Sequence, residues 1–250
     1  MFATNRISNA ALAISSASSH RVFINTSFEM MASQISSFDS TDATTSKATS
    51  GQLVSDSQTL ASTVAADARV LRSAELRLDD ASWLTAFSRG GLKDEADRVE
   101  HATKALADVK GAADDSGHLG QFLEAYFQVD IDLMTFLTDI EKSDPSGAAN
   151  AYSSLRTDTP NALQLANVPG LPPEFHDFLV AIQAYAADLR QESIASAAGD
   201  QTALAAAEKS ALADFDKAVA IDFAGTTAKI RSYYQHYRDD FNAEMDKATP

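Results

Sequence analysis

The sequence predicts an all-α protein, an elongated antiparallel helical bundle with long N-terminal helices and a C-terminal helical hairpin. Two observations predict it. Apolar residues recur every three or four positions over long stretches, which is the spacing that gives a helix one apolar face. No segment shows the alternation of apolar and polar residues that is typical of a half-buried strand. The apolar content of 45% is that of a globular protein and argues against a disordered chain.

The first expected helix covers residues 4–37. Ile7, Ile14, Phe28 and Ile35 share one heptad position, which is the repeat of a helix packed along a partner helix. Small residues fill the rest of this seam, so the packing is either close or weak. The Thr- and Ser-rich stretch Ser40–Gly51 is expected to be a loop.

The second expected helix covers residues 52–88, where Val64, Leu71 and Leu78 recur every seven positions. Gly90 and Gly91 are expected to end it, because glycine is common just past a helix C-terminus. At about 1.5 Å per residue, two such helices reach about 50 Å each, which predicts the elongated bundle.

Two further helices are expected over residues 92–111 and 118–142, separated by a turn at Gly111–Gly117. The second of them has the strongest apolar face of the chain and should be central to the core.

Asp144 and Pro145 are typical of a helix start, because Asp caps free backbone N–H groups and Pro suits the first helical position. A short helix to about Leu155 is expected, and then a further turn of helix from Thr159-Pro160. The Pro-rich stretch 168–173 is the best candidate boundary between a long-helix bundle (1–168) and a helical hairpin packed on it (169–250), but an ordinary loop within one continuous domain is favoured.

The hairpin begins with a helix over residues 173–198. Gly199 is expected to stop this helix and Asp200 to cap the next one. The last helix has its own apolar seam, formed by Ile230, Tyr234, Tyr237, Phe241 and Met245.

Charge and composition exclude several classes of function. The formal net charge of −15 argues against nucleic-acid binding, which depends on Lys and Arg at the phosphates. The chain has no cysteine, so disulfides, thiolate chemistry and iron–sulfur clusters are excluded. No apolar run is long enough for a transmembrane segment, and no cofactor is predicted.

The aromatic concentration at the C-terminus is the first candidate site. Tyr233, His236 and Tyr237 are candidate ligand-binding residues, together with Trp83 near the end of the second expected helix. The alternative is a packed core with two residues at its rim.

Asp97, Glu100 and His101 are the candidate metal ligands, because Asp97 and His101 share a helix face at a spacing of four. His236 with Asp239 is a second such set. An exposed acid–imidazole pair is the alternative in both cases. No histidine has Glu three residues before it, which excludes the di-iron bundle motif. No phosphate-binding loop or nucleophile elbow occurs, and the chain is predicted not to be an enzyme.

The N-terminus allows three interpretations. No acid occurs before Glu29, whereas Arg6 and Arg21 lie among Ser and Ala. This composition suits a mitochondrial transit segment, a bacterial secretion leader or a bundle helix. The sustained heptad favours the bundle helix.

The C-terminal region shows a resemblance. Its motifs are Leu171-Pro172-Pro173-Glu174-Phe175, Gly199-Asp200, Ile230-Arg231-Ser232-Tyr233-Tyr234 and Phe241-Asn242-Ala243-Glu244-Met245. Over these last 80 or so residues the chain resembles uncharacterised membrane-tethered helical lipoproteins of actinobacterial type. The resemblance implies an envelope location and a binding role. The lipid-bearing cysteine of such proteins is absent here, so an anchor would lie outside this chain.

These observations predict a non-enzymatic helical-bundle binding module, exported or envelope-associated, for a partner protein or a small ligand. A sensor domain belongs to this class, because ligand binding can shift one long helix against another. The alternative is a structural subunit of a filament, secretion device or particle, forming a homo-oligomer through helix 4–37. A cytoplasmic location is the alternative to export.

Overall fold

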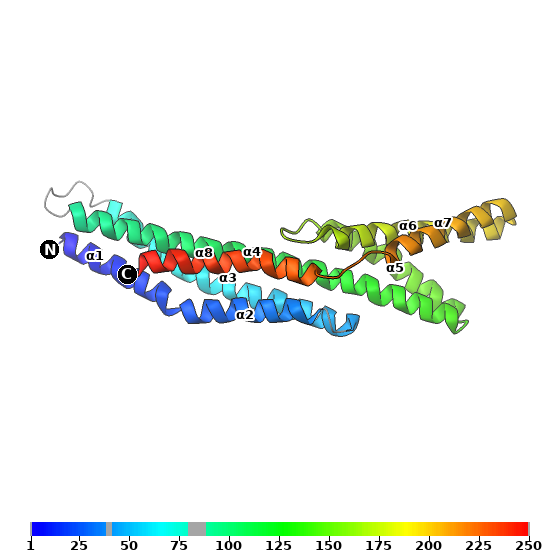
Figure 1. Ribbon diagram of the computed structural model, residues 1–250, viewed down its shortest axis with the longest axis horizontal. Coiled ribbons are helices and arrows are strands. Elements are labelled where there is room, and N and C mark those ends of the chain that lie inside the picture. The colour runs from blue at the N-terminus through cyan, green and yellow to red at the C-terminus, as the bar shows by residue number, and fades with distance from the viewer. Residues whose placement is uncertain (1, 39–41, 80–88, 250) are drawn as a thin grey trace. The chain divides into compact units, whose positions relative to one another are not determined.

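The structure is a computed structural model that describes residues 2–38, 42–79 and 89–249. Every regular element in these residues is an α-helix, which confirms the predicted all-α bundle. No described helix has both the length and the apolar character needed to span a bilayer. In chain order (Figure 1) the helices are α1 (Phe2–Ser19), α2 (Arg21–Ser37), α3 (Ala43–Asp79), α4 (Arg89–Glu141), α5 (Pro145–Leu165), α6 (Pro173–Ala198), α7 (Gln201–Val219) and α8 (Thr226–Ala248).

The helices form two compact units. Unit 1 consists of Met1–Ser33, Leu53–Gly117 and Arg231–Pro250, and unit 2 consists of Gln34–Gln52 and His118–Ile230. Helices α2, α3, α4 and α8 therefore contribute residues to both units. Each unit also combines residues from both sides of the predicted boundary at residue 168.

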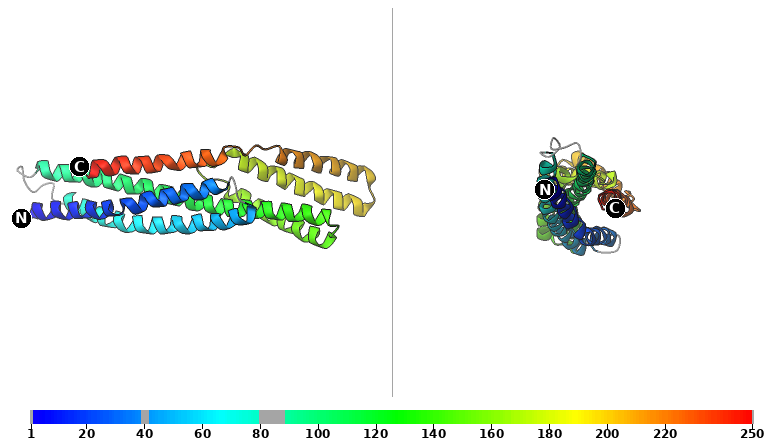
Figure 2. Two further views of the ribbon diagram at one scale, coloured as in Figure 1. Left: turned by 60° about the horizontal axis from the view of Figure 1, so that its bottom comes forward. Right: turned by 90° about the vertical axis from the view of Figure 1, so that its left-hand side faces the viewer.

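In unit 1, α1 and α2 lie along α3, α4 and α8, as both views show (Figures 1 and 2). Each helix turns its apolar stripe inward, because that face gains free energy when it leaves water. Burying one such side chain contributes roughly 1.5–3 kcal/mol. Fully buried examples come from every helix and include Ile14, Ile24, Leu60, Leu106 and Phe241.

Polar side chains join the helices of unit 1 at its surface. Arg21 of α2 donates from Nε to Oδ1 of Asn242 on α8 over 2.9 Å. Asn242 in turn donates from Nδ2 to Oδ1 of Asn25 over 2.9 Å. At the junction of α1 and α2, Nδ1 of His20 lies 2.6 Å from Oδ2 of the buried Asp67 on α3. These contacts fix the register of α2 against α3 and α8.

In unit 2, α6 and α7 pack along each other as a hairpin, and α5 packs on α6 (Figure 2). The C-terminal half of α4 supplies the aromatic core of the unit. Phe122 and Tyr126 of α4 contact Phe175 of α6, with ring centroids 6.0 and 5.0 Å apart. Edge-to-face pairs of this kind add roughly 0.5–1.5 kcal/mol each beyond the area that they bury.

The helix ends of unit 2 confirm the predicted capping residues. Asp144 accepts hydrogen bonds from the backbone N–H groups of Ser146 and Gly147, with Pro145 in the first position of α5. Asp200 caps α7 in the same way. Gly199 ends α6 with φ of 68°, a left-handed conformation that glycine adopts without a steric penalty.

The predicted turn at Gly111–Gly117 is wrong, because α4 runs through it without a break. The two glycines lie where neighbouring helices approach closely. A methyl group at Gly111 would lie 3.2 Å from the Tyr237 ring, and one at Gly117 would lie 3.0 Å from Oγ of Ser57. Gly90 and Gly91 do not end a helix either, since both lie in the first turn of α4.

The predicted loop Ser40–Gly51 is wrong from residue 43 onward, where α3 begins. Asp42 caps this helix by accepting from the backbone N–H of Thr45 over 3.0 Å. Within the helix, the Ser50 hydroxyl donates to the carbonyl of Ser46 over 2.8 Å. The hydroxyl side chains therefore find partners inside the helix and do not break it.

Two predicted boundaries in other helices are also wrong. The expected single helix 4–37 is interrupted at His20, which separates α1 from α2. The expected break between Leu155 and Pro160 is absent, because α5 continues through Pro160. Proline inside a helix costs about 3 kcal/mol, and the buried residues Leu155 and Ala162 on either side of it offset that cost.

Candidate functional site

The predicted ligand-binding residues of α8 lie together in unit 1. The hydroxyls of Tyr233 and Tyr237 both donate to Oδ2 of Asp115 on α4, over 2.8 and 2.9 Å. The His236 ring packs on Tyr237 with centroids 4.2 Å apart. Burial, followed by the neighbouring hydroxyl and carboxylate, raises the pKa of Tyr233, and burial raises that of Tyr237. Because both hydroxyls already have a partner, the cluster serves as a link between α4 and α8.

The sequence does not indicate Asp115 as a partner of these tyrosines, because Asp115 falls in the predicted turn Gly111–Gly117. The fourth predicted ligand-binding residue, Trp83, lies outside the described residues. A ligand at Tyr233, His236 and Tyr237 stays a prediction.

The predicted metal ligands Asp97, Glu100 and His101 are not brought together. Glu100 pairs with Lys104, whose Nζ lies 2.7 Å from Oε1. The Nδ1 atom of His101 lies 2.6 Å from Oε2 of Glu244 on α8. Asp97 is exposed, and within the described ranges no three His, Asp or Glu side chains gather as metal ligands.

An aromatic cavity of about 350 Å³ lies in unit 2. Its described walls come from four separate parts of the chain, and they consist of Phe38, Tyr126, Phe127, Phe175, Phe223, Ala224, Thr226 and Thr227. The rings contact one another around it, with centroids 5.0 Å apart for Tyr126 and Phe175 and 5.3 Å for Phe175 and Phe223. We call this space the aromatic cavity.

The aromatic cavity offers few hydrogen-bonding groups to a ligand. The Thr226 hydroxyl donates to the carbonyl of Phe223 over 2.8 Å. Thr227 is buried and has an interaction of its own. Burial raises the pKa of Tyr126, so its phenol is neutral at physiological pH. Ring faces and edges are therefore the main surface that a ligand would meet.

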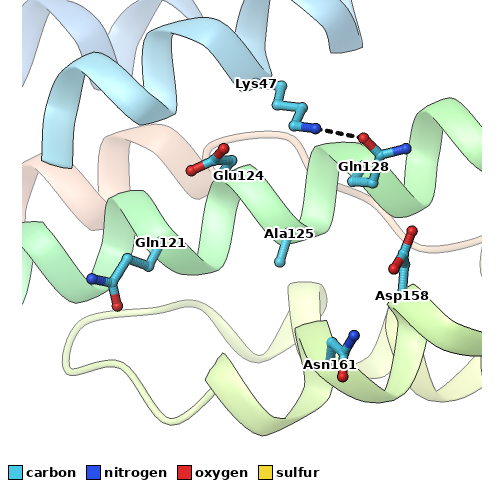
Figure 3. Close-up of a pocket in the computed structure, with 7 residues that line it drawn as sticks. All are labelled: Lys47, Gln121, Glu124, Ala125, Gln128, Asp158 and Asn161. Carbon is cyan, nitrogen blue, oxygen red and sulfur yellow. Dashed lines mark hydrogen bonds between the residues drawn. The ribbon is translucent and has the colours of Figure 1, made fainter.

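A second cavity of about 320 Å³ in unit 2 is polar, and we call it the polar cavity. Figure 3 shows its seven drawn residues, Lys47, Gln121, Glu124, Ala125, Gln128, Asp158 and Asn161. Lys47 of α3 donates from Nζ to Oε1 of Gln128 over 2.5 Å. Gln128 in turn donates from Nε2 to Oδ1 of Asp132 over 2.7 Å.

Asp132, which accepts from the lining residue Gln128, is only 7% exposed. Its Oδ2 atom is buried and has no hydrogen-bond partner among the described residues. Burial raises the pKa of Asp132 to about 6, although the hydrogen bond from Gln128 favours the carboxylate. The facing carboxylate of Asp158 also raises this pKa. Asp132 is therefore protonated more readily than an exposed aspartate.

Comparison with known proteins gives no relative. No family model matches the chain, and no curated protein and no solved structure matches it. The candidate site therefore depends on the geometry of the described residues alone.

Sequence reasoning missed the aromatic cavity and the polar cavity. The rings of the aromatic cavity are up to 185 positions apart, from Phe38 to Phe223, and each is part of an ordinary apolar seam. A spacing rule applies within one helix and does not show which seams meet. The only local signal was the dense apolar face predicted for residues 118–142, which supplies Tyr126 and Phe127.

Proposed function

We propose that this chain is a non-enzymatic helical-bundle module that binds a small ligand, and that the aromatic cavity of unit 2 holds this ligand. The observation that carries the proposal is a cavity of about 350 Å³ lined by rings from four segments. Small-molecule sites are typically clefts of roughly 300–1,000 Å³ lined mainly by apolar and aromatic side chains, with a few polar groups. The aromatic cavity agrees with this description in size and in lining.

The lining favours binding over catalysis. The described residues around the aromatic cavity include no histidine, carboxylate or amine that could transfer a proton. The Thr226 hydroxyl is occupied by the Phe223 carbonyl. A ligand would thus be held by burial of apolar surface and by ring contacts, so we expect it to be small and largely apolar.

A titration with N-phenyl-1-naphthylamine, a neutral fluorescent probe of apolar sites, tests the proposal. We expect a saturable rise in fluorescence with one site per chain. The variant Ala224→Trp should abolish this signal, because Ala224 is an exposed lining residue and the indole ring would fill the cavity.

Ala213→Trp is the matched control, since Ala213 is exposed on α7 in the same unit and does not line the cavity. It should bind the probe as the unchanged chain does. Helicity measured by circular dichroism must be the same in all three proteins. Lack of saturable binding by the unchanged chain, or equal binding by both tryptophan variants, would contradict the proposal.

We further propose that the module is exported or envelope-associated. The support is the resemblance of the C-terminal region to membrane-tethered helical lipoproteins. Native mass spectrometry of the protein purified from its own source tests both parts. A processed or lipid-modified N-terminus with a retained small molecule would support them, and an unprocessed chain from the cytosol without added mass would contradict them.

A specific observation also favours the alternative of an assembly subunit. Helices α1 and α2 carry large apolar side chains in water, among them Leu12, which is 68% exposed, and Val22, which is 77% exposed. A second copy of the chain would cover them. Sedimentation velocity over a wide range of concentrations should then show association that Leu12→Gln weakens, and a monomer at every concentration would refute this alternative.

A further inference from the structure

A third cavity of unit 2, between α5 and α6, differs in charge from the rest of the protein. It has a volume of about 220 Å³ and is lined by Leu155, Arg156, Thr159, Pro160, Gln183, Ala186, Ala187, Arg190 and Gln191. Two of these residues are arginines and none is acidic, although acids outnumber bases in the chain by 35 to 20. We call it the arginine cavity.

Both arginines are exposed, and neither is paired with an acid of the described chain. Neither Arg156 nor Arg190 forms an ion pair or a side-chain hydrogen bond within the described residues. Arg156 instead lies over the Tyr152 ring, with Cζ 5.7 Å from the ring centroid. Tyr152 is itself held, because its hydroxyl donates to the carbonyl of Ala186 on α6 over 3.0 Å. The Tyr152 ring thus supports the Arg156 guanidinium beside the cavity.

Thr159 gives an independent indication of a ligand. It lines the arginine cavity, is only 1% exposed, and has a buried hydroxyl without any hydrogen-bond partner in the described chain. Buried hydroxyls normally have a partner, because leaving one unpaired is unfavourable. A hydroxyl is both donor and acceptor, so an anionic oxygen that reached it from the cavity would supply the missing partner.

The remaining walls define the ligand further. Leu155, Pro160, Ala186 and Ala187 provide apolar surface beside the two arginines. Guanidinium groups bind planar carboxylates through two parallel hydrogen bonds. The volume of about 220 Å³ lies below the usual range for drug-sized ligands. We infer that the arginine cavity binds a small organic carboxylate, with the carboxylate at Arg156, Arg190 and Thr159 and the carbon skeleton on the apolar wall.

This site is separate from the aromatic cavity, with which it shares no lining residue. Failure of the proposed binding in the aromatic cavity would therefore not contradict carboxylate binding in the arginine cavity, and the reverse also holds. N-phenyl-1-naphthylamine, which carries no anionic group, should not compete with a ligand of the arginine cavity.

Fluorine NMR with 4-fluorobenzoate as the probe tests the inference on the full chain. We expect saturable line broadening that the carboxylate 4-methylvalerate reverses and that the neutral isostere benzamide does not. Arg156→Gln and Arg190→Gln should each weaken binding by about tenfold or more, because each removes a charge-assisted pair of hydrogen bonds. Arg72→Gln removes the same charge from an exposed position of unit 1 and should leave the affinity unchanged.

Thr159→Val separates a ligand-binding role from a purely structural one. It replaces a buried, unpartnered hydroxyl by a methyl group of the same shape, so the variant should melt at a higher temperature than the unchanged chain. It should nevertheless bind 4-fluorobenzoate several-fold more weakly. A higher melting temperature with unchanged affinity would exclude Thr159 from the site.

Three results would overturn the inference. The first is that neither 4-fluorobenzoate nor 4-methylvalerate binds saturably. The second is that Arg72→Gln weakens binding as much as the two cavity variants do, which would mean nonspecific charge attraction. The third is that inorganic phosphate displaces the probe at least as well as 4-methylvalerate does, which would mean a general oxyanion site without selection for a carbon skeleton.

Discussion

Replacing Asp132 by Asn should stabilise the protein at neutral pH and leave its stability almost unchanged in acid. Asp132 is 7% exposed, and its Oδ2 has no partner within the described residues. Burial and the facing Asp158 raise its pKa from 3.8 to about 6. The charged form is therefore disfavoured in the folded state. Because this shift belongs to the interacting pair Asp132 and Asp158, the difference between the two pKa values sets an upper limit of about 3 kcal/mol at neutral pH.

The pH dependence has a defined sign. Between pH 3.8 and about 6 the folded state holds a proton on Asp132 that the unfolded state has lost. The free energy of unfolding contributed by this group therefore falls as the pH rises through this window, and it stays low above it. The asparagine side chain of the variant has no charge to desolvate, still accepts from Gln128, and can donate from Nδ2 to Asp158. We expect Asp132→Asn to gain roughly 1–3 kcal/mol at pH 7 and almost nothing at pH 4.

Chemical denaturation at several pH values, followed by circular dichroism, measures this difference. Glu124→Gln is the matched control, because Glu124 lines the same polar cavity but is exposed, so its effect should stay within about 0.5 kcal/mol. Asp158→Asn should also stabilise at pH 7, and the double variant should gain less than the sum of the two, because the carboxylates interact. A neutral or destabilising Asp132→Asn at pH 7, or a gain that does not shrink toward pH 4, would refute the reasoning.

Five further substitutions test the helix packing by thermal denaturation. Gly51→Ala should stabilise the protein by about 0.5–1 kcal/mol, because nothing lies within 4 Å of the new methyl group. Gly111→Ala should stabilise it less or destabilise it, because the new methyl group would lie 3.2 Å from the Tyr237 ring. Gly199→Ala should destabilise by roughly 1 kcal/mol, since its φ of 68° strains any other residue. Tyr237→Phe should destabilise by about 0.5–1.5 kcal/mol, because it removes the hydrogen bond to the α4 carboxylate. Pro160→Ala should stabilise the protein by roughly 1–3 kcal/mol, because alanine restores a backbone donor inside α5. Equal melting temperatures for the Gly51 and Gly111 variants, or an unchanged melting temperature for any of the other three, would contradict the corresponding prediction.

The parts of the fold that sequence predicted correctly depend on short-range rules. Asp144 and Asp200 cap helices through their own neighbours, and Gly199 ends α6 through its own backbone conformation. Apolar seams such as Leu60, Val64 and Leu71 are also visible within a single helix. Such features need no knowledge of which helices meet.

The errors arise where a tertiary contact changes the meaning of a local signal. Gly111 and Gly117 are typical of a turn when only the sequence is known. In the structure Tyr237 and Ser57 lie against them, so that even a methyl group would be in tight contact. The same reason explains the candidate site. The sequence places Tyr233 beside the apolar seam that contains Tyr237, but Asp115, which accepts from both hydroxyls, lies 118 and 122 positions earlier in the chain. Contacts between distant segments cannot be deduced from periodicity.

Two consecutive residues of α5, Thr159 and Pro160, are unfavourable for the stability of the helix, and both line the arginine cavity. Thr159 keeps a buried hydroxyl without a partner, and Pro160 removes a backbone donor from the middle of the helix. Both features lower the stability of the folded chain. Thr159→Val would remove the first and Pro160→Ala the second. Departures from local consistency are expected at functional sites, where binding compensates for them. Arg156 and Arg190 line the same cavity, so a bound carboxylate of the kind proposed would offset the cost of the hydroxyl that the described part of the fold leaves without a partner.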